Sequence, residues 1–403
     1  MSKRLFPNKL IAFCGLTISL LALAGCGGGG SGAAPASGVT TTVTGVASKG
    51  PIANGTVKIF AINPDGSKGL LASVSTGADG SYSATINYTG PIYLEASGSY
   101  LDEATGLTKT IDPATPLRAA LASATGTVAV AVTPLTDLAV QKAATLTPVN
   151  ITAANQLVSE LFKVDIIGVQ PVAPTQAAFT AQGTTQPQRD YALALAALSE
   201  MATTSGGVNQ TVSTLASALG AGTTLPPATA QQVTGALSNY LASANNTTPV
   251  TSITQTNLVN VGGEIVSVKL STTGTLPARS LIGGISLTLA LPAGVTVKAD
   301  PSNGAILSGV LTPSGVLSAS GNLLETGRYV AAQGSAPATV TVLVEQATGF
   351  AAGQFATLVC DYPAGATPPT ADQFAIQSFK VVDTNTADLN KNQNVIGISL
   401  QVQ

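Results

Sequence analysis

The chain has no histidine and no tryptophan, and charged residues make up only 9% of its 403 positions. Without histidine, a Ser-His-Asp triad or a Cys-His pair cannot form, which excludes hydrolysis by those arrangements. Zinc and iron centres built on imidazole are excluded for the same reason. The phosphate-binding P-loop, the Gly-x-Ser-x-Gly nucleophile motif and the Ser-x-x-Lys motif are also missing from the sequence.

The first 26 residues are organised as a secretory signal. Lys3, Arg4 and Lys9 give a positive start, and the apolar stretch at 10–23 that follows is too short to span a bilayer comfortably. The stretch ends in Leu23-Ala24-Gly25-Cys26, which resembles the lipobox of bacterial lipoproteins. The resemblance implies removal of residues 1–25, a diacylglycerol on the Cys26 thiol and three acyl chains in all, enough for stable membrane anchoring.

The residue after the cysteine bears on the membrane in which the protein would reside. Gly27 stands where retention in the inner membrane usually needs Asp, so the resemblance favours the outer membrane, on its periplasmic or surface-exposed side. Removing residues 1–25 takes away three cations and no anion, which changes the formal net charge from −2 to −5. This mild charge argues against nucleic acid as a partner.

Cysteine is scarce as well, with three residues in the chain. Cys14 would leave with the signal and Cys26 would be acylated, so Cys360 remains alone and no intrachain disulfide is expected. Cys360 follows Leu358 at strand spacing and has no neighbouring cation to lower its pKa. We therefore interpret it as a small buried apolar residue rather than a reactive thiol.

The rest of the chain predicts a multidomain protein, beginning with a sandwich of β-strands. Residues 26–38 form a lipidated, Gly/Ser-rich flexible linker. Residues 39–112 predict short antiparallel strands, separated by turns such as Asn63-Pro64-Asp65-Gly66 and Asp79-Gly80. The runs at 50–57 (GPIANGTV) and 76–82 (TGADGSY) resemble the carboxypeptidase-regulatory-like, transthyretin-type Ig-like domain. That resemblance implies an accessory module without catalysis.

Residues 113–250 predict an α-helical region. Thr133 and Pro134 are suited to cap and start a helix, and the run Thr133–Ala139 (TPLTDLA) resembles the helical segment that follows such Ig-like domains in bacterial secreted proteins. Apolar periodicity and helix-breaking residues predict further helices at 155–164, 189–201, 208–219 and 228–241. A polar loop is predicted at 175–187.

Residues 251–403 predict a second β-sandwich. Ile285, Leu287 and Leu289 alternate with polar or small residues, and three further segments repeat this period of two. The runs LTLALPAGVTV, ATVTVLV and FKVVDTNTADL resemble cohesin-like and carbohydrate-binding-module jelly-roll sandwiches, more loosely than the first match. The expected fold is thus an Ig-like sandwich, a helical bundle and a jelly-roll or cohesin-like sandwich.

The densest group of oxygen ligands lies near the C-terminus. Asp383, Asn385 and Asp388 are candidate ligands for Ca²⁺, because a calcium loop needs oxygen donors at alternating positions. Ala387 interrupts the pattern, and neither the bend glycine nor the closing glutamate is present. We favour the alternative, an Asx-rich hairpin between the last two strands. No other cofactor is expected.

Two further groups in the first sandwich have a functional and a structural interpretation. Glu95, Asp102 and Glu103 would suit a hydrolase that uses two carboxylates about 5–9 Å apart, whereas solvated loop positions are commoner. The tyrosines of this region would suit a sugar-stacking platform, whereas packing in the core and at edges is commoner; they are Tyr82, Tyr88, Tyr93 and Tyr100.

Taken together, these features predict a non-catalytic lipoprotein with a display, binding or structural role in the cell envelope. The expected partners are the membrane, through the lipid, and a polysaccharide or another envelope protein. Two alternatives remain open at this point. One is a carboxylate-based hydrolase that acts on polysaccharide, and the other is a calcium-stabilised adhesin.

Overall fold

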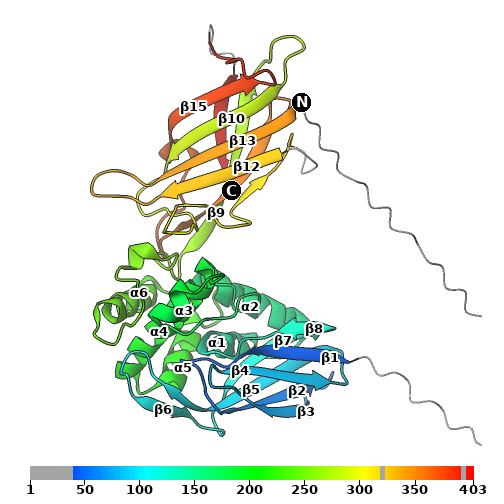
Figure 1. Ribbon diagram of the computed structural model, residues 1–403, viewed down its shortest axis with the longest axis vertical. Coiled ribbons are helices and arrows are strands. Elements are labelled where there is room, and N and C mark those ends of the chain that lie inside the picture. Colours follow the sequence, from blue (N-terminus) through cyan, green and yellow to red (C-terminus); the bar gives the residue numbers. More distant parts are fainter. Residues whose placement is uncertain (1–39, 318–322, 392–395) are drawn as a thin grey trace, which may run out of the picture. The chain divides into compact units, whose positions relative to one another are not determined.

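The computed structural model describes residues 40–317, 323–391 and 396–403 (Figure 1). The predicted signal, Cys26 and the linker lie outside the described residues. In the described part of the chain, no helix is both long and apolar enough to cross a membrane.

The N-terminal strands form the two sheets of a sandwich. One sheet has the order β4-β1-β8, and the other has the order β3-β2-β5-β6 with β7 also paired to β5. Side chains alternate between the core and solvent along the strands. In β4, Tyr82, Ala84 and Ile86 are buried while the residues between them are exposed. The strands are β1 (Thr41–Val46), β2 (Thr56–Ile62), β3 (Lys68–Ser75), β4 (Ser81–Ile86), β5 (Gly90–Leu101), β6 (Thr108–Ile111), β7 (Leu117–Ala124) and β8 (Thr127–Ala129).

The sandwich extends past residue 112, into the region predicted to be helical. β7 pairs with β5 in an antiparallel register, with Arg118 opposite Glu95, and β8 lies parallel to β1. The prediction of an all-helical 113–250 is therefore wrong at these two strands. The sequence of β7, LRAALASA, is rich in alanine, which has little strand preference of its own, so the pairing with β5 decides its conformation.

In the described part of the chain, six α-helices follow the sandwich. α1, α5 and α6 begin within one residue of the predicted positions, whereas α4 begins three residues earlier than predicted and α2 seven residues earlier. Thr133 caps α1 by accepting a hydrogen bond from the Thr136 amide, and Pro134 occupies the first turn. The loop predicted at 175–187 contains a short helix, α3, which is capped by Thr175. The helices are α1 (Pro134–Ala143), α2 (Pro148–Phe162), α3 (Gln176–Thr180), α4 (Gln186–Ser205), α5 (Val208–Leu219) and α6 (Pro227–Ala242).

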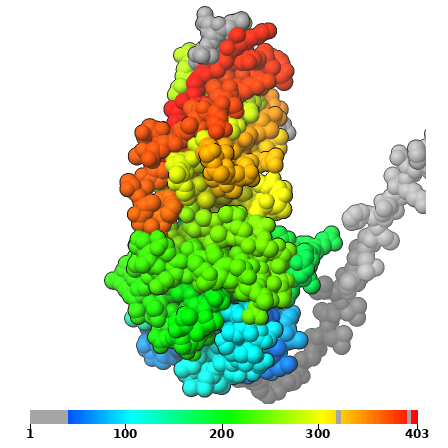
Figure 2. Space-filling view, turned by 90° about the vertical axis from the view of Figure 1, so that its left-hand side faces the viewer, coloured from blue at the N-terminus to red at the C-terminus, as the bar shows by residue number. Residues whose placement is uncertain are grey.

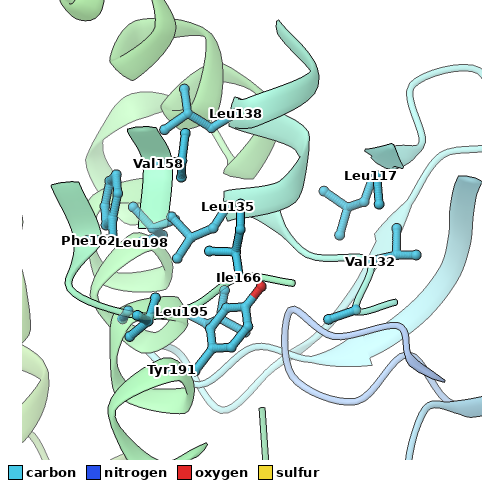
Figure 3. Packing of buried hydrophobic residues seen from close by; sticks show 14 of the residues in the cluster. Leu117, Val132, Leu135, Leu138, Val158, Phe162, Ile166, Tyr191, Leu195 and Leu198 are labelled. Carbon is cyan, nitrogen blue, oxygen red and sulfur yellow. The ribbon is translucent and has the colours of Figure 1, made fainter. Parts of the chain in front are cut away.

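The helices and the N-terminal sandwich share one hydrophobic core. Figure 3 shows Leu135 of α1, Phe162 of α2 and Leu195 of α4 converging, with Leu117 of β7 nearby. A smaller cluster on the other face of the β2-β5-β7 sheet brings Tyr93 of β5 against α1 and α2 residues. The helical residues, green in Figure 2, therefore pack directly on the blue and cyan strands rather than forming a separate bundle.

The C-terminal region forms the predicted β-sandwich, with two four-stranded sheets in the orders β12-β13-β10-β15 and β11-β14-β9-β16. Its core is separate from the first and includes Cys360, which is fully buried. β15 and β16 lie in different sheets, so the Asx-rich segment between them connects two sheets and is not a hairpin. The strands are β9 (Glu264–Gly274), β10 (Ile282–Ala290), β11 (Leu311–Pro313), β12 (Leu323–Val330), β13 (Thr339–Phe350), β14 (Gln354–Tyr362), β15 (Ala375–Asp383) and β16 (Ile396–Val402).

We expect Leu135→Ala to lower the free energy of unfolding by about 2–5 kcal/mol, the usual cost of a cavity in a packed core. Leu135 is fully buried in the core that sheet and helices share, so amide exchange should accelerate in β5 and β7 as well as in α1 and α4. Val149→Ala serves as the control, since Val149 is 77% exposed on α2. Faster exchange confined to the helices would contradict a common core.

Candidate functional site: a buried lysine with two carboxylates

Lys49 lies in the turn between β1 and β2 and is fully buried, although it is a lysine. The turn closes through a hydrogen bond from the Ile52 amide to the Ala47 carbonyl at 3.0 Å. Gly50 follows with a φ of +66°, and a Cβ there would come within 2.3 Å of the Leu101 carbonyl oxygen. Glycine thus lets the turn lie against the end of β5, beside Asp102 and Glu103.

Asp102 and Glu103 immediately follow β5 and neutralise the Lys49 ammonium. The Lys49 Nζ lies 3.5 Å from the Asp102 Oδ2 and 3.2 Å from the Glu103 Oε2. Lys109 of β6 approaches the same Asp102 oxygen at 3.3 Å. A buried charge is stable only when it is paired and hydrogen-bonded, and two carboxylates with two ammonium groups balance here.

The helical region contributes the fourth polar group of this cluster, which we call the Lys49 cluster: Lys49, Asp102, Glu103 and Ser199. Ser199 lies in α4 and is fully buried. Its hydroxyl accepts a hydrogen bond from Lys49 and donates one to the Glu103 Oε2 at 2.5 Å. The cluster therefore joins the sandwich to the longest helix.

The two carboxylates differ in how their oxygens are used. The Asp102 Oδ1 accepts hydrogen bonds from the Thr105 amide at 3.0 Å and the Thr105 hydroxyl at 2.7 Å. Burial alone would raise the pKa of Asp102, but Lys49, Thr105 and Lys109 together hold that pKa below its ordinary value. In contrast, the Glu103 Oε1 is buried and has no hydrogen-bond partner among the described residues.

A cavity of about 580 Å³ adjoins the cluster and is lined by both carboxylates. Tyr100 of β5 and Tyr240 of α6 contribute apolar surface, and Lys49 lies 5.4 Å from the centre of the Tyr100 ring. Burial, followed by the charges of Asp102 and Glu103, raises the pKa of Tyr100, so its hydroxyl stays protonated. The cavity thus offers a mixed apolar and anionic wall.

Of the three carboxylates considered for hydrolysis, the structure brings two together. Glu95 lies on β5 opposite Arg118 and does not join Asp102 and Glu103. Asp102 and Glu103 share one buried lysine and line the same cavity, so hydrolysis by a pair of carboxylates stays a prediction. Lys49 was missed by sequence reasoning, and its only signal was a cation placed between small and apolar residues, in the run VASKGPI.

The tyrosines of the first sandwich are packing residues in this structure, as the commoner interpretation predicted. Tyr82 is 5% exposed and donates a hydrogen bond to the Val130 carbonyl at 2.6 Å. Tyr93 is buried and its ring lies 6.0 Å from that of Phe60. The four rings do not form a common exposed platform, because Tyr82, Tyr93 and Tyr100 are buried and Tyr88 is half-buried.

Two of the candidate calcium ligands, Asp383 and Asp388, each use one carboxylate oxygen within their own turn. The Asp383 Oδ1 accepts hydrogen bonds from the amides of Asn385 and Ala387, both at 2.8 Å, and the Asp388 Oδ1 accepts one from the Asn390 amide at 2.8 Å. Among the described residues there is no group of three or more His, Cys, Asp or Glu side chains placed to hold a metal. Calcium binding by Asp383, Asn385 and Asp388 stays a prediction.

Cys360 lies in β14 within the C-terminal core. Burial, with a smaller contribution from Asp361, raises the pKa of its thiol to about 12. The thiolate is therefore scarce at neutral pH, which agrees with the structural interpretation of this residue.

A second group of buried polar residues connects the helices to the C-terminal sandwich. The Lys163 Nζ at the end of α2 lies 2.7 Å from the Asp361 Oδ1 and donates a hydrogen bond to the Gly263 carbonyl at 2.9 Å. Asp190 of α4 accepts a hydrogen bond from the Asn257 side chain at 2.7 Å. A cavity of about 890 Å³ is lined by these residues.

Comparison with known proteins finds few similarities. No family model matches the chain, and a search of curated proteins finds no match. Among solved structures, a similarity is found to a non-cellulosomal cohesin from the hyperthermophilic archaeon Archaeoglobus fulgidus. It has 12% sequence identity and a TM-score of 0.21, and it covers 32% of this chain and 74% of the cohesin. A likeness at that level establishes neither fold nor function.

We expect Asp190 to make the protein less stable as pH rises from about 4 to about 6. Burial raises the pKa of Asp190 to about 6, from an ordinary value of 3.8. The folded state therefore binds a proton that the unfolded state releases, and ionisation costs about 3 kcal/mol by the top of this window.

The measurement is chemical denaturation of the wild type and Asp190→Asn between pH 4 and pH 8. As pH rises through the window, the free energy of unfolding of the wild type should fall relative to that of the variant, because the amide of the variant cannot ionise. Asp112→Asn, at an exposed turn, gives the background effect of removing one carboxylate. Parallel pH profiles for the wild type and Asp190→Asn would refute the assignment to Asp190.

Proposed function

We propose that the protein is a non-catalytic lipoprotein of the bacterial envelope that presents its C-terminal sandwich to a polysaccharide or another envelope protein. The lipobox-like run ending at Cys26 supports anchoring, and the residue after it supports the outer membrane. The Ig-like resemblance of the first sandwich supports an accessory role. The buried charges of the first sandwich, Lys49 with Asp102 and Glu103, neutralise one another, which favours a structural role for these two carboxylates.

The observation that carries the proposal is the exposure of the edge strands in the C-terminal sandwich. β12 and β15 are the two edges of one sheet, and the first four residues of β15 are exposed. Ile376 on β15 is 46% exposed, and Leu324 on β12 is 50% exposed. Residues 304–306 pair with part of β12, which leaves β15 as the more open edge. An edge strand with exposed apolar side chains is a surface on which a partner strand or an extended ligand can bind.

The anchoring half of the proposal is tested by feeding cells an alkyne-tagged fatty acid. The wild type should be labelled and recovered with outer membranes, whereas Cys26→Ser should carry no label, since it lacks the acceptor thiol. Cys14→Ser is the matched control, because it changes a cysteine within the predicted signal that the lipobox does not use. Labelling of Cys26→Ser, or an unlabelled wild type, would be incompatible with a lipid on Cys26.

The binding half is tested with the detergent-purified full chain on a glycan array and in pull-downs from envelope extracts. Ile376→Glu should weaken capture by about tenfold or more, because losing an apolar anchor at the centre of a contact costs about 1.4 kcal/mol or more. Leu70→Glu makes the same change on β3, an edge strand of the first sandwich, where Leu70 is 60% exposed. Equal loss in both variants, or no specific capture by the wild type, would count against this surface.

A further inference from the structure

The Lys49 cluster places a primary amine and a carboxyl group in contact, away from water. Lys49 is fully buried and its Nζ lies 3.2 Å from the Glu103 Oε2. A lysine amine and a carboxylic acid can condense to an amide when they are held together, because contact at a fixed geometry replaces the encounter of two reactants.

We propose that Lys49 and Glu103 become joined by a side-chain amide bond, with Asp102 as the proton carrier and Ser199 as the hydrogen-bond donor to the oxygen that leaves. The link would bind the turn after β1 to the turn after β5. It goes beyond the proposed function and does not depend on it, since it requires neither a lipid nor a ligand.

Glu103 rather than Asp102 is the acceptor of the new bond, because their oxygens are held differently. Both oxygens of Asp102 have partners, Thr105 on one side and the two lysines on the other. The Glu103 Oε2 is held by Ser199 and Lys49, while the Oε1 has no partner among the described residues. Glu103 therefore has one oxygen more than its partners need, and the single oxygen of an amide can serve the Ser199 hydrogen bond, whereas loss of either Asp102 oxygen would leave a donor without its acceptor.

The reaction balances without any outside reagent. The Lys49 ammonium gives one proton to the Glu103 Oε2, the oxygen that its Nζ contacts at 3.2 Å, which leaves a neutral amine and a carboxylic acid. The amine nitrogen attacks the Glu103 Cδ, an N–C bond forms, and the carbonyl electrons move onto the Oε1, while the Ser199 hydroxyl holds the Oε2. The ammonium and carboxylate thus become a tetrahedral intermediate with a protonated nitrogen.

Asp102 then moves the second proton. Its Oδ2 lies 3.5 Å from the Lys49 Nζ, so it can take a proton from the nitrogen of the intermediate and deliver it to the Oε2 hydroxyl, which lies against the same nitrogen. The C–Oε2 bond breaks, water leaves, and the C=O bond forms again at the Oε1. The low pKa of Asp102 suits the delivery of that proton, and the adjoining cavity of about 580 Å³ gives the water a place to go.

The chemistry leaves a definite signature in the intact, full-length protein. Denatured wild-type protein is digested with trypsin and a second, less selective protease, and the peptides are sequenced by tandem mass spectrometry. A branched species should appear in which a peptide containing Lys49 is joined to one containing Glu103, with a mass 18 Da below the sum of the two. Trypsin should fail to cleave after Lys49 in the joined species, since its amine is no longer charged.

Two variants separate the covalent bond from an ion pair. Lys49→Arg keeps the buried cation but has no nucleophilic amine, so the branched species and the 18 Da loss should vanish while unmodified Glu103 peptides are recovered. Asp102→Asn keeps the size of the side chain but cannot carry the proton, so the joined fraction should fall. Lys58→Arg, at an exposed position on β2, is the matched control and should leave the branched species unchanged.

Some outcomes overturn the proposal outright. If wild-type digests yield only peptides cleaved after Lys49 and unmodified Glu103, the cluster is an ion pair and nothing more. If the branch point is Asp102, the argument from the free Glu103 oxygen is wrong. Because these readings are made on the wild type, they stand even if a variant fails to fold.

Discussion

A buried ammonium group must be neutralised where it lies, and this constraint organises the N-terminal half of the protein. Lys49 is out of reach of water, so two carboxylates from the turn after β5 and a hydroxyl from α4 have to meet it. Meeting these partners fixes the β1–β2 turn against the end of β5 and sets α4 on the sandwich. Removal of one partner would leave a charge without compensation, which costs far more than the pairing itself contributes.

The sequence predicts elements whose signals are local. Alternating apolar residues identify β4, β10 and β13, and the Thr133-Pro134 cap identifies the start of α1, because each pattern depends only on near neighbours. β7 was assigned wrongly, since its alanines suit either helix or strand and only pairing with β5 selects the strand. The common core of sheet and helices was also missed, because an amphipathic helix does not show which surface covers it.

The candidate site could be predicted only in part for the same reason. Asp102 and Glu103 attract attention as neighbouring acids, but their charge partner is 53 residues away from Asp102 and their hydroxyl partner lies in α4. The junction with the C-terminal sandwich is more distant still, since Lys163 and Asp361 come from different regions of the chain. Such contacts depend on tertiary structure, and charge patterns along one sequence do not contain them.

The position of β1 has a mechanical consequence. β1 is the first described strand, and it is paired on both sides, antiparallel to β4 and parallel to β8. Tension along β1 loads its hydrogen bonds to both neighbours together, in shear, rather than opening them one at a time. Lys49 follows three residues after the end of β1. The buried cluster is therefore a second point of resistance, which a force applied at the start of β1 reaches only after β1 has separated from its neighbours.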